Sequence, residues 1–181
     1  MNRAFLGTAL SVLLIAGCAQ TQRAADTGVA AVRAQSNPTL STTDAAFMTT
    51  AGRGGMAEVQ LAQLAQRNGR SPAVKRFAAH MIEDHGRANQ EMMEMARQKQ
   101  VSPPSGIGAD QQQVYDRLAG LRGAAFDRAY AQTMVEDHEE DVRAFQAEAQ
   151  NGTDPDVKAF AARELPMLQE HLRMAQAMTR R

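Results

Sequence analysis

Cysteine is nearly absent from the sequence, and the single one, Cys18, lies close to the amino terminus. Without a second thiol the chain cannot form an internal disulfide, and a thiolate metal site or thiol redox chemistry is not expected. Aromatic residues are also scarce, because there is no tryptophan and only 4% of the residues are aromatic. The abundant residues are good helix formers such as alanine, glutamine, leucine and methionine, so the composition predicts helices.

An excess of charge of either sign is also missing, since 20 basic residues balance 20 acidic ones. A nucleic-acid-binding domain needs a basic face that neutralises phosphates, and a polybasic membrane-surface module needs a similar cluster. We therefore expect no nucleic-acid partner. The sequence also lacks a Ser-His-Asp order, a phosphate-binding glycine loop and a haem-attachment motif, so no catalytic residues are predicted.

The first 17 residues combine a positive charge at Arg3 with an apolar stretch from Ala4 to Ala16. This stretch is too short to span a membrane and has the organisation of a secretory signal peptide. At its end, a Leu-Ile-Ala-Gly-Cys segment resembles the lipobox of bacterial lipoproteins. The resemblance implies that residues 1–17 are a lipoprotein signal peptide and that Cys18 becomes the lipidated first residue of the exported chain. An ordinary signal peptide that contains a cysteine is the alternative.

The residues after the cysteine predict where the protein is held and how the domain is attached. In bacterial lipoproteins, an aspartate directly after the lipidated cysteine is a signal for retention in the inner membrane. This chain has Ala19 at that position. Resemblance to these sorting signals therefore favours the outer membrane, with the protein facing the periplasm. Residues 18–42 are rich in alanine, threonine, glutamine and serine, which predicts a flexible, lipid-anchored tether. Residues 43–180 are then expected to form one domain.

Four long stretches with apolar residues at helical spacing make up this domain. The helices are expected over residues 44–68, 71–100, 124–150 and 154 to near the carboxyl terminus. The pairs Ser71-Pro72 and Asp154-Pro155 have the form of a capping residue followed by proline at the first helical position. Pro166 lies inside the last stretch and predicts a kink there.

The sequence therefore predicts an all-α fold, a four-helix bundle. The segment between the second and third helices contains a proline-rich break and a short extra helix over residues 110–119. It is long enough to cross the length of the bundle, as the long connection in ferritin-like bundles does, and we expect a ferritin-like arrangement. An up-down-up-down order remains an alternative.

Five polar side chains interrupt the apolar stripes of these helices, and all five are capable of binding a metal. They are Glu58, His85, His138, Glu164 and His171. Each helix contributes at least one of them, and Glu58 and the three histidines lie near the midpoints of their helices. An α-helix rises by about 1.5 Å per residue, so these four residues lie within roughly 6 Å of the middle of the bundle along its length. This holds for either direction of each helix, because reversing a helix leaves its midpoint unchanged. They are therefore expected to meet in the core.

A short internal repeat surrounds two of the histidines, since residues 81–85 (Met-Ile-Glu-Asp-His) recur as residues 134–138 (Met-Val-Glu-Asp-His). Asp84 and Asp137 can serve as second ligands, as partners that fix the imidazoles, or as solvated neighbours, and the sequence does not rank these roles. His80 lies off the apolar stripe and is expected at the surface. The methionines are interpreted mainly as core residues, with periplasmic copper handling as the alternative.

Four segments of the predicted helices form a recognisable set of motifs. They are Gly-Met-Ala-Glu-Val around Glu58, residues 74–78 leading into Glu83-Asp84-His85, Phe126-Asp127 through His138, and Leu165-Pro166 followed by His171. Together they resemble an exported bacterial family catalogued as domain of unknown function 4142. The resemblance covers about residues 43–178 and implies a ferritin-like four-helix fold and export, but no established activity. Di-iron ferritin-like sites use a Glu-x-x-His motif that this sequence lacks, which argues against di-iron oxygen chemistry.

The preferred hypothesis is one transition-metal ion held by Glu58, His85, His138 and His171, with Glu164 as an extra ligand. This donor set suits zinc, copper, iron or manganese. The competing interpretation is a hydrogen-bonded polar network without a metal, in a non-enzymatic envelope protein that binds a partner or protects against stress. An oxidase or peroxide-consuming enzyme at a metal centre is a third hypothesis. The sequence does not indicate an oligomeric state.

Overall fold

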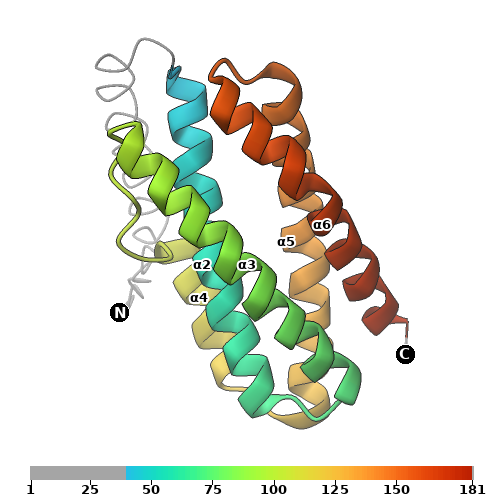
Figure 1. Cartoon of the computed structure of the whole chain (residues 1–181). Coiled ribbons are helices and arrows are strands. Elements are labelled where there is room, and N and C mark those ends of the chain that lie inside the picture. Colours follow the sequence, from blue (N-terminus) through green and yellow to red (C-terminus); the bar gives the residue numbers. More distant parts are fainter. Residues whose placement is uncertain (1–39, 181) are drawn as a thin grey trace, which may run out of the picture.

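The structure, a computed structural model, describes residues 40–180, and these residues form helices and no strands (Figure 1). The helices are α2 (Thr42–Asn68), α3 (Pro72–Gln98), α4 (Ala109–Ala119), α5 (Gly123–Asn151) and α6 (Pro155–Thr179). The prediction of an all-α domain is confirmed. The signal peptide, Cys18 and nearly all of the expected tether lie outside the described residues. None of the described helices combines the length and the apolar character needed to span a membrane.

The helix starts are set by capping side chains. Ser71 accepts a hydrogen bond from the backbone of α3, and Asp154 accepts two from the first turn of α6, in each case before a proline at the first helical position. These two starts agree with the sequence prediction. Ser41 and Asp44 form a reciprocal capping box at the start of α2. Pro166 lies inside α6, which continues as one helix on both sides of it.

Hydrogen bonds at the two ends of the bundle fix the direction of each helix. At the lower end in Figure 1, the backbone N–H groups of Arg70 and Ser71, between α2 and α3, donate to Asp127 near the start of α5. At the upper end, the N–H groups of Thr153 and Asp154, between α5 and α6, donate to Asp44 near the start of α2. Helices α3 and α5 therefore run in the same direction. The connection that contains α4 must return the chain from the upper end to the lower end, and Figure 1 shows this crossing.

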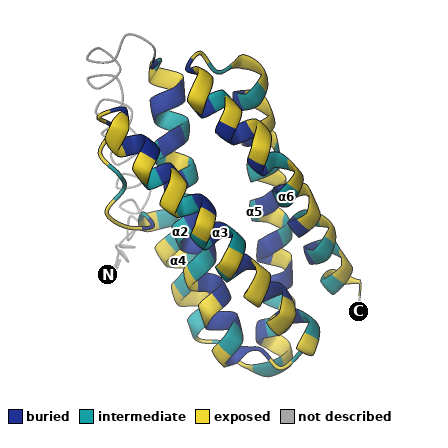
Figure 2. Cartoon of the chain, viewed as in Figure 1, coloured by how far each residue is buried: buried dark blue, intermediate teal, exposed yellow. Residues whose placement is uncertain are grey.

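Figure 2 marks the buried residues along the helices. Their apolar side chains form two clusters, one toward each end of the bundle. The upper cluster includes Met48, Met92, Phe145, Phe160 and Leu168. The lower cluster includes Leu61, Phe77, Met81, Phe126 and Tyr130. Burial of each large apolar side chain stabilises the fold by about 1.5–3 kcal/mol. Glu58, His85, His138 and His171 are buried but belong to neither apolar cluster, and they form a polar layer between the two.

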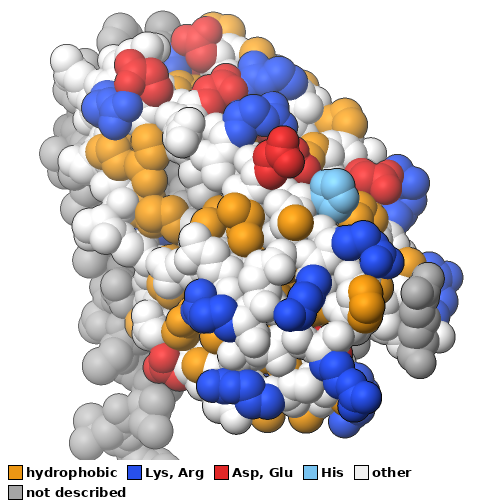
Figure 3. Space-filling model, turned by 60° about the horizontal axis from the view of Figure 1, so that its bottom comes forward, with side chains coloured by type: hydrophobic (Ala, Val, Ile, Leu, Met, Phe, Trp, Pro, Cys, Tyr) orange, Lys and Arg blue, Asp and Glu red, His pale blue; other side chains and the backbone are white. Residues whose placement is uncertain are grey.

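Surface charge is distributed unevenly although the chain is neutral as a whole. Basic side chains gather on the lower end of the bundle, where Figure 3 shows more blue than red. Exposed basic residues in or next to α2, α3 and α5 near this end are Arg67, Arg70, Lys75, Arg76, Arg122 and Arg128. A net charge of zero therefore does not mean that each face of the molecule is neutral.

Candidate metal centre

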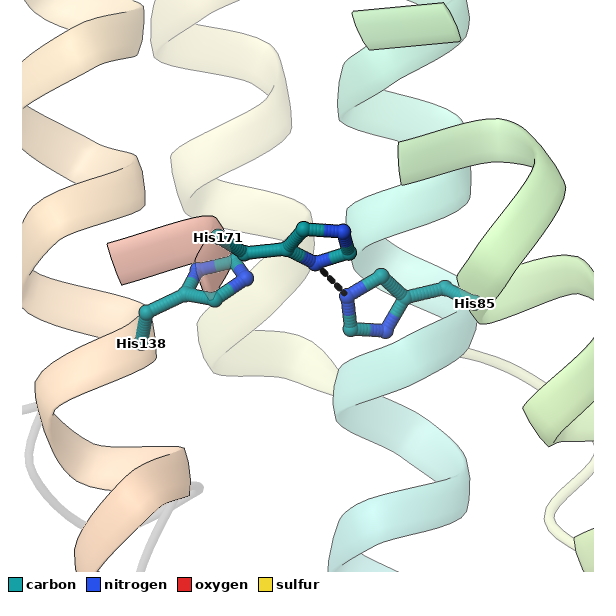
Figure 4. A group of neighbouring side chains, drawn as sticks. All are labelled: His85, His138 and His171. Carbon is teal, nitrogen blue, oxygen red and sulfur yellow. Dashed lines mark hydrogen bonds between the residues drawn. The ribbon is translucent and has the colours of Figure 1, made fainter. Parts of the chain in front are cut away.

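Three histidines from three helices meet in the polar layer: His85 from α3, His138 from α5 and His171 from α6. Each side chain is buried, and the three residues are 4%, 0% and 2% exposed, respectively. Their ring centroids are 5.2 to 5.6 Å apart, and Figure 4 shows the rings pointing toward one another. Residues separated by as many as 86 positions in the chain are thus brought into contact.

The ring nitrogens of these histidines converge. One nitrogen from each ring lies within 4.8 Å of the nitrogens from the other two. His85 Nε2 and His171 Nδ1 are 3.3 Å apart, while His138 Nε2 is buried and has no hydrogen-bond partner among the described residues. Nitrogens bound to one tetrahedral zinc ion at 2.0–2.1 Å are about 3.3 Å apart, so modest ring movements would bring all three to that spacing.

The other nitrogen of each ring contacts an oxygen. His85 Nδ1 lies 2.9 Å from Glu58 Oε2, and His171 Nε2 lies 3.1 Å from Asp84 Oδ2. His138 Nδ1 lies 2.9 Å from the carbonyl oxygen of Met134, one turn earlier in α5. Oxygen partners of this kind hold the ring orientation and the tautomer of metal-binding histidines. With these outer nitrogens donating, the lone pairs of the inner nitrogens are directed at the centre of the cluster.

Burial keeps the three histidines neutral at physiological pH. Desolvation, together with His85 and His171, lowers the pKa of His138 to about 3. Desolvation and His85 lower the pKa of His171 to about 4, against the opposing influence of Asp84. The pKa of His85 is lowered by burial, although Asp141, Asp84 and Glu164 counteract the shift. A neutral imidazole has a free lone pair, which is the form that binds a metal.

The same contacts also permit a hydrogen-bond chain without a metal. Burial, reinforced by the charge of Asp137, raises the pKa of Glu58 well above its usual range. A protonated Glu58 can donate to His85 Nδ1, and His85 Nε2–H can then donate to His171 Nδ1. His171 Nε2–H completes the chain by donating to Asp84. This chain satisfies His85 and His171 but leaves His138 Nε2 without a donor.

The two predicted glutamates lie beside the histidine cluster rather than within it. Glu58 contacts His85 and, more weakly, His138 Nδ1 at 3.5 Å. Glu164 is buried and forms an ion pair with Arg163 at 3.2 Å. Both glutamates and His85 line a small cavity of about 20 Å³, which is large enough for one water molecule. The structure thus places a carboxylate of each glutamate next to the cluster, with Glu58 closer to the histidines.

Two acidic residues of α5 adjoin the cluster, and only one of them was singled out from the sequence. Asp137, from the internal repeat, is partly buried, and burial together with Glu136 and Glu140 raises its pKa to about 6. Asp141 was missed, and burial with the charge of Glu58 raises its pKa well above the usual range. The signal for Asp141 was present, since it follows His138 by three residues and so shares its helical face.

His80, two methionines and three glycines complete the description of the residues near the site. His80 is exposed, as predicted. Met92 and Met95 are buried in the upper apolar cluster, which confirms that they fill the core. A side chain at Gly52 would crowd Pro104, and one at Gly55 would overlap with Asn89, so these glycines permit close packing beside the polar layer. Gly54 faces open space instead.

Comparison with known proteins gives a fold and a family. The structure is similar to the crystal structure of a DUF305 fragment from Deinococcus radiodurans, with a TM-score of 0.68 and 14% identity over 78% of this chain and 99% of that one. It is also similar to CopM in the Cu(II)-bound form, with a TM-score of 0.61 and 18% identity over 76% of this chain and 95% of that one. At these identities the likeness shows a shared helical fold.

Sequence comparison is more direct for the family. No curated protein matches the chain. The family model described as domain of unknown function (DUF4142) matches residues 29–178. This range contains all the described helices except Thr179, the last residue of α6. The sequence resemblance to this family is thereby confirmed, and the chain belongs to the DUF4142 family.

Proposed function

We propose that this protein is a lipoprotein of the bacterial cell envelope that binds one transition-metal ion through His85, His138 and His171. The observation that carries the proposal is the convergence of three buried imidazole nitrogens, one of which, His138 Nε2, has no hydrogen-bond partner among the described residues. Buried polar atoms are nearly always satisfied, so an unpartnered acceptor that faces two other histidines indicates a bound cation. The proposal assigns Glu58 and Asp84 to orienting His85 and His171.

Copper is the metal that the donor set favours. Neutral imidazoles suit the later divalent metals, and affinity for nitrogen sites rises along the first row to Cu(II). CopM in the Cu(II)-bound form has a similar fold, which supports this choice. Zinc is the next candidate on the same grounds. Glu58 and Glu164 remain candidates for a fourth ligand, because both line the small cavity beside His85.

The proposal extends to the setting of the protein. A lipid on Cys18 would anchor the chain in the outer membrane, and residues 18–42 would tether a ferritin-like four-helix domain that faces the periplasm. Support comes from the lipobox-like segment and from the crossing connection between α3 and α5. The role we infer is metal binding rather than catalysis. The alternative is a partner-binding or stress-protection module whose histidines form only the hydrogen-bond chain through Glu58 and Asp84.

Metal analysis and spectroscopy test the proposal. The full protein, extracted in detergent and purified without chelator or a metal-affinity tag, is titrated with Cu(II) and followed by electron paramagnetic resonance. We expect one equivalent to bind with nitrogen hyperfine coupling, and the double substitution His138→Ala and His171→Ala to abolish it. The matched control is His80→Ala, which removes an exposed histidine of α3 and should change nothing. If the double variant, folded by circular dichroism, binds copper as the wild type does, the proposed site is wrong.

A further inference from the structure

A cleft between α2 and α5, closed at one side by α4, lies next to the polar layer. Its volume is about 540 Å³, which falls within the range of small-molecule sites. Phe47, Ala51 and Ala57 of α2 and Phe145 of α5 give it a largely apolar wall. Gly54 contributes open space, since a Cβ atom there would meet nothing within 4 Å. The cleft adjoins the 20 Å³ cavity beside His85, since Glu58, Asp141 and Phe145 line both. It can hold a molecule of ten or so non-hydrogen atoms, roughly the size of a substituted benzene ring.

The ionisable side chains that line this α2/α5 cleft are all acidic. The acidic side chains that line it are Glu58, Asp137, Glu140, Asp141 and Glu148. No lysine, arginine or histidine is among the described residues that line it. Phe47 and Phe145 stand edge to face in its wall, with ring centroids 4.9 Å apart. Aromatic faces together with carboxylates are the groups that recognise an organic cation.

One oxygen at the inner end of the cleft lacks a donor. Glu58 is 3% exposed, and its Oε2 atom contacts His85 Nδ1. Its Oε1 atom is buried and has no well-aligned donor: His138 Nδ1 lies 3.5 Å away and is directed at the Met134 carbonyl, and the other neighbouring group is the carboxyl of Asp141. A buried oxygen of this kind requires an N–H or O–H partner. A ligand in the cleft with a protonated amine at its leading end would supply both the donor and a countercharge for the neighbouring Asp141.

We propose that the α2/α5 cleft binds a small amphipathic primary amine in its ammonium form. The ammonium group donates to Glu58 Oε1 and faces Asp141, and the apolar body packs against Phe47 and Phe145. An anion of the same size is excluded, because every charged group that lines the cleft repels it and none compensates the loss of its hydration. The amine site uses none of the three histidines, and Glu58 is the residue that contacts both the cleft and His85.

The probes for the test are three molecules of matched size and different charge. The full protein in detergent is titrated by calorimetry with 2-phenylethylamine, 2-phenylethanol and phenylacetate at neutral pH. We expect the amine to bind, the alcohol to bind at least tenfold more weakly and the acid not to bind. Asp141→Asn should weaken amine binding by about tenfold or more, as expected for loss of a charge-assisted contact.

Two glycine substitutions provide a matched pair. Gly54→Leu places a side chain into the cleft and should abolish binding of the amine. Gly86→Leu makes the same change on α3, where the added atoms also begin in open space but outside the cleft, and should leave binding unchanged. Both variants replace a helical glycine and should fold.

The proposal is overturned if no probe binds, if phenylacetate binds as well as the amine, or if Gly54→Leu binds the amine normally. If none of the three probes binds, a segment of a protein is the alternative occupant of the cleft. The variant His138→Ala with His171→Ala separates this proposal from the metal site, because it should lose copper and keep the amine. Failure of copper binding alone therefore does not affect the amine site, and failure of amine binding alone does not affect the metal site.

Discussion

Asp84 provides a test of how the proposed metal site is held together. Its Oδ2 atom lies 3.1 Å from His171 Nε2, and its Oδ1 atom lies 3.5 Å from Arg87. The Asp84 side chain is 29% exposed, so Asp84→Asn leaves no buried cavity and should fold. The substitution removes the negative charge that fixes the His171 tautomer and makes its ring a stronger ligand.

The size of the effect follows from the position of the carboxylate. Loss of such a partner typically reduces metal affinity by about 10- to 100-fold, or roughly 1.4–2.7 kcal/mol. Because Asp84 is partly exposed, solvent screens its charge, and we expect a value near the tenfold end. Competition of the protein with a chelating indicator for Cu(II) at pH 7 measures the change directly.

Glu83→Gln is the matched control, because Glu83 is the exposed neighbour of Asp84 and its substitution removes the same charge. We expect its copper affinity to stay within about twofold of the wild type, since a fully solvated charge has little influence on a buried site. Equal affinities of the Asp84 and Glu83 variants would refute the orienting role of Asp84. A change in the number of bound nitrogens in Asp84→Asn would show that Asp84 holds His171 in place, not merely its tautomer.

Three further predictions concern stability, each measured by urea denaturation followed by circular dichroism. Asp44→Ala should reduce the free energy of unfolding by about 3–5 kcal/mol, because three backbone N–H groups lose their acceptor; a loss below about 1 kcal/mol would contradict this. Glu148→Gln should match the wild type at pH 4 and exceed it by about 1–2 kcal/mol at pH 8.5. Burial and Asp44 raise the pKa of Glu148 to about 7, so the stability that its proton provides is lost as the pH rises through that value. Equal pH profiles would rule this out. Gly86→Ala should stabilise the fold by about 0.5–1 kcal/mol, whereas Gly52→Ala should gain less because its Cβ would lie 3.2 Å from Pro104.

The contribution of Asp44 to stability changes with pH in the direction opposite to that of Glu148. Burial alone would raise the pKa of Asp44, but hydrogen bonds from Thr153 and Ser41 outweigh it and lower the pKa. The stabilisation from Asp44 is therefore present above the pKa of the unfolded chain and is lost as the pH falls through the lowered value. A shallower acid-induced loss of stability in Asp44→Ala than in the wild type would accompany its lower stability at pH 7.

Local signals in the sequence were sufficient to predict the helices. Ser71-Pro72 and Asp154-Pro155 set the starts of α3 and α6 through local capping, which needs no knowledge of the rest of the fold. Helical periodicity also indicated that Glu58 and the three histidines face inward. Their common height followed from their positions near the helix midpoints, because reversal of a helix leaves its midpoint unchanged.

Contacts between helices were beyond the reach of the same reasoning. Asp84 precedes His85 in the chain, yet it contacts His171 on another helix, and the sequence did not rank its possible roles. Glu58 was predicted to bind a metal directly, and this stays a prediction; in the structure its Oε2 atom contacts the outer nitrogen of His85. Both outcomes depend on helix rotation and separation, which periodicity does not determine. Asp141 could have been found from its spacing to His138.

The metal proposed for the polar layer between the two apolar clusters would give the bundle a removable cross-link. A chain with a single cysteine cannot close a loop by an internal disulfide, but an ion held by three histidines would tie α3, α5 and α6 together across as many as 86 residues. Cross-links over long loops restrict the unfolded chain most, and a ligand that binds only the folded state stabilises it in proportion to the logarithm of its concentration. The stability of this domain, and its resistance to proteolysis, would then vary with the supply of the metal.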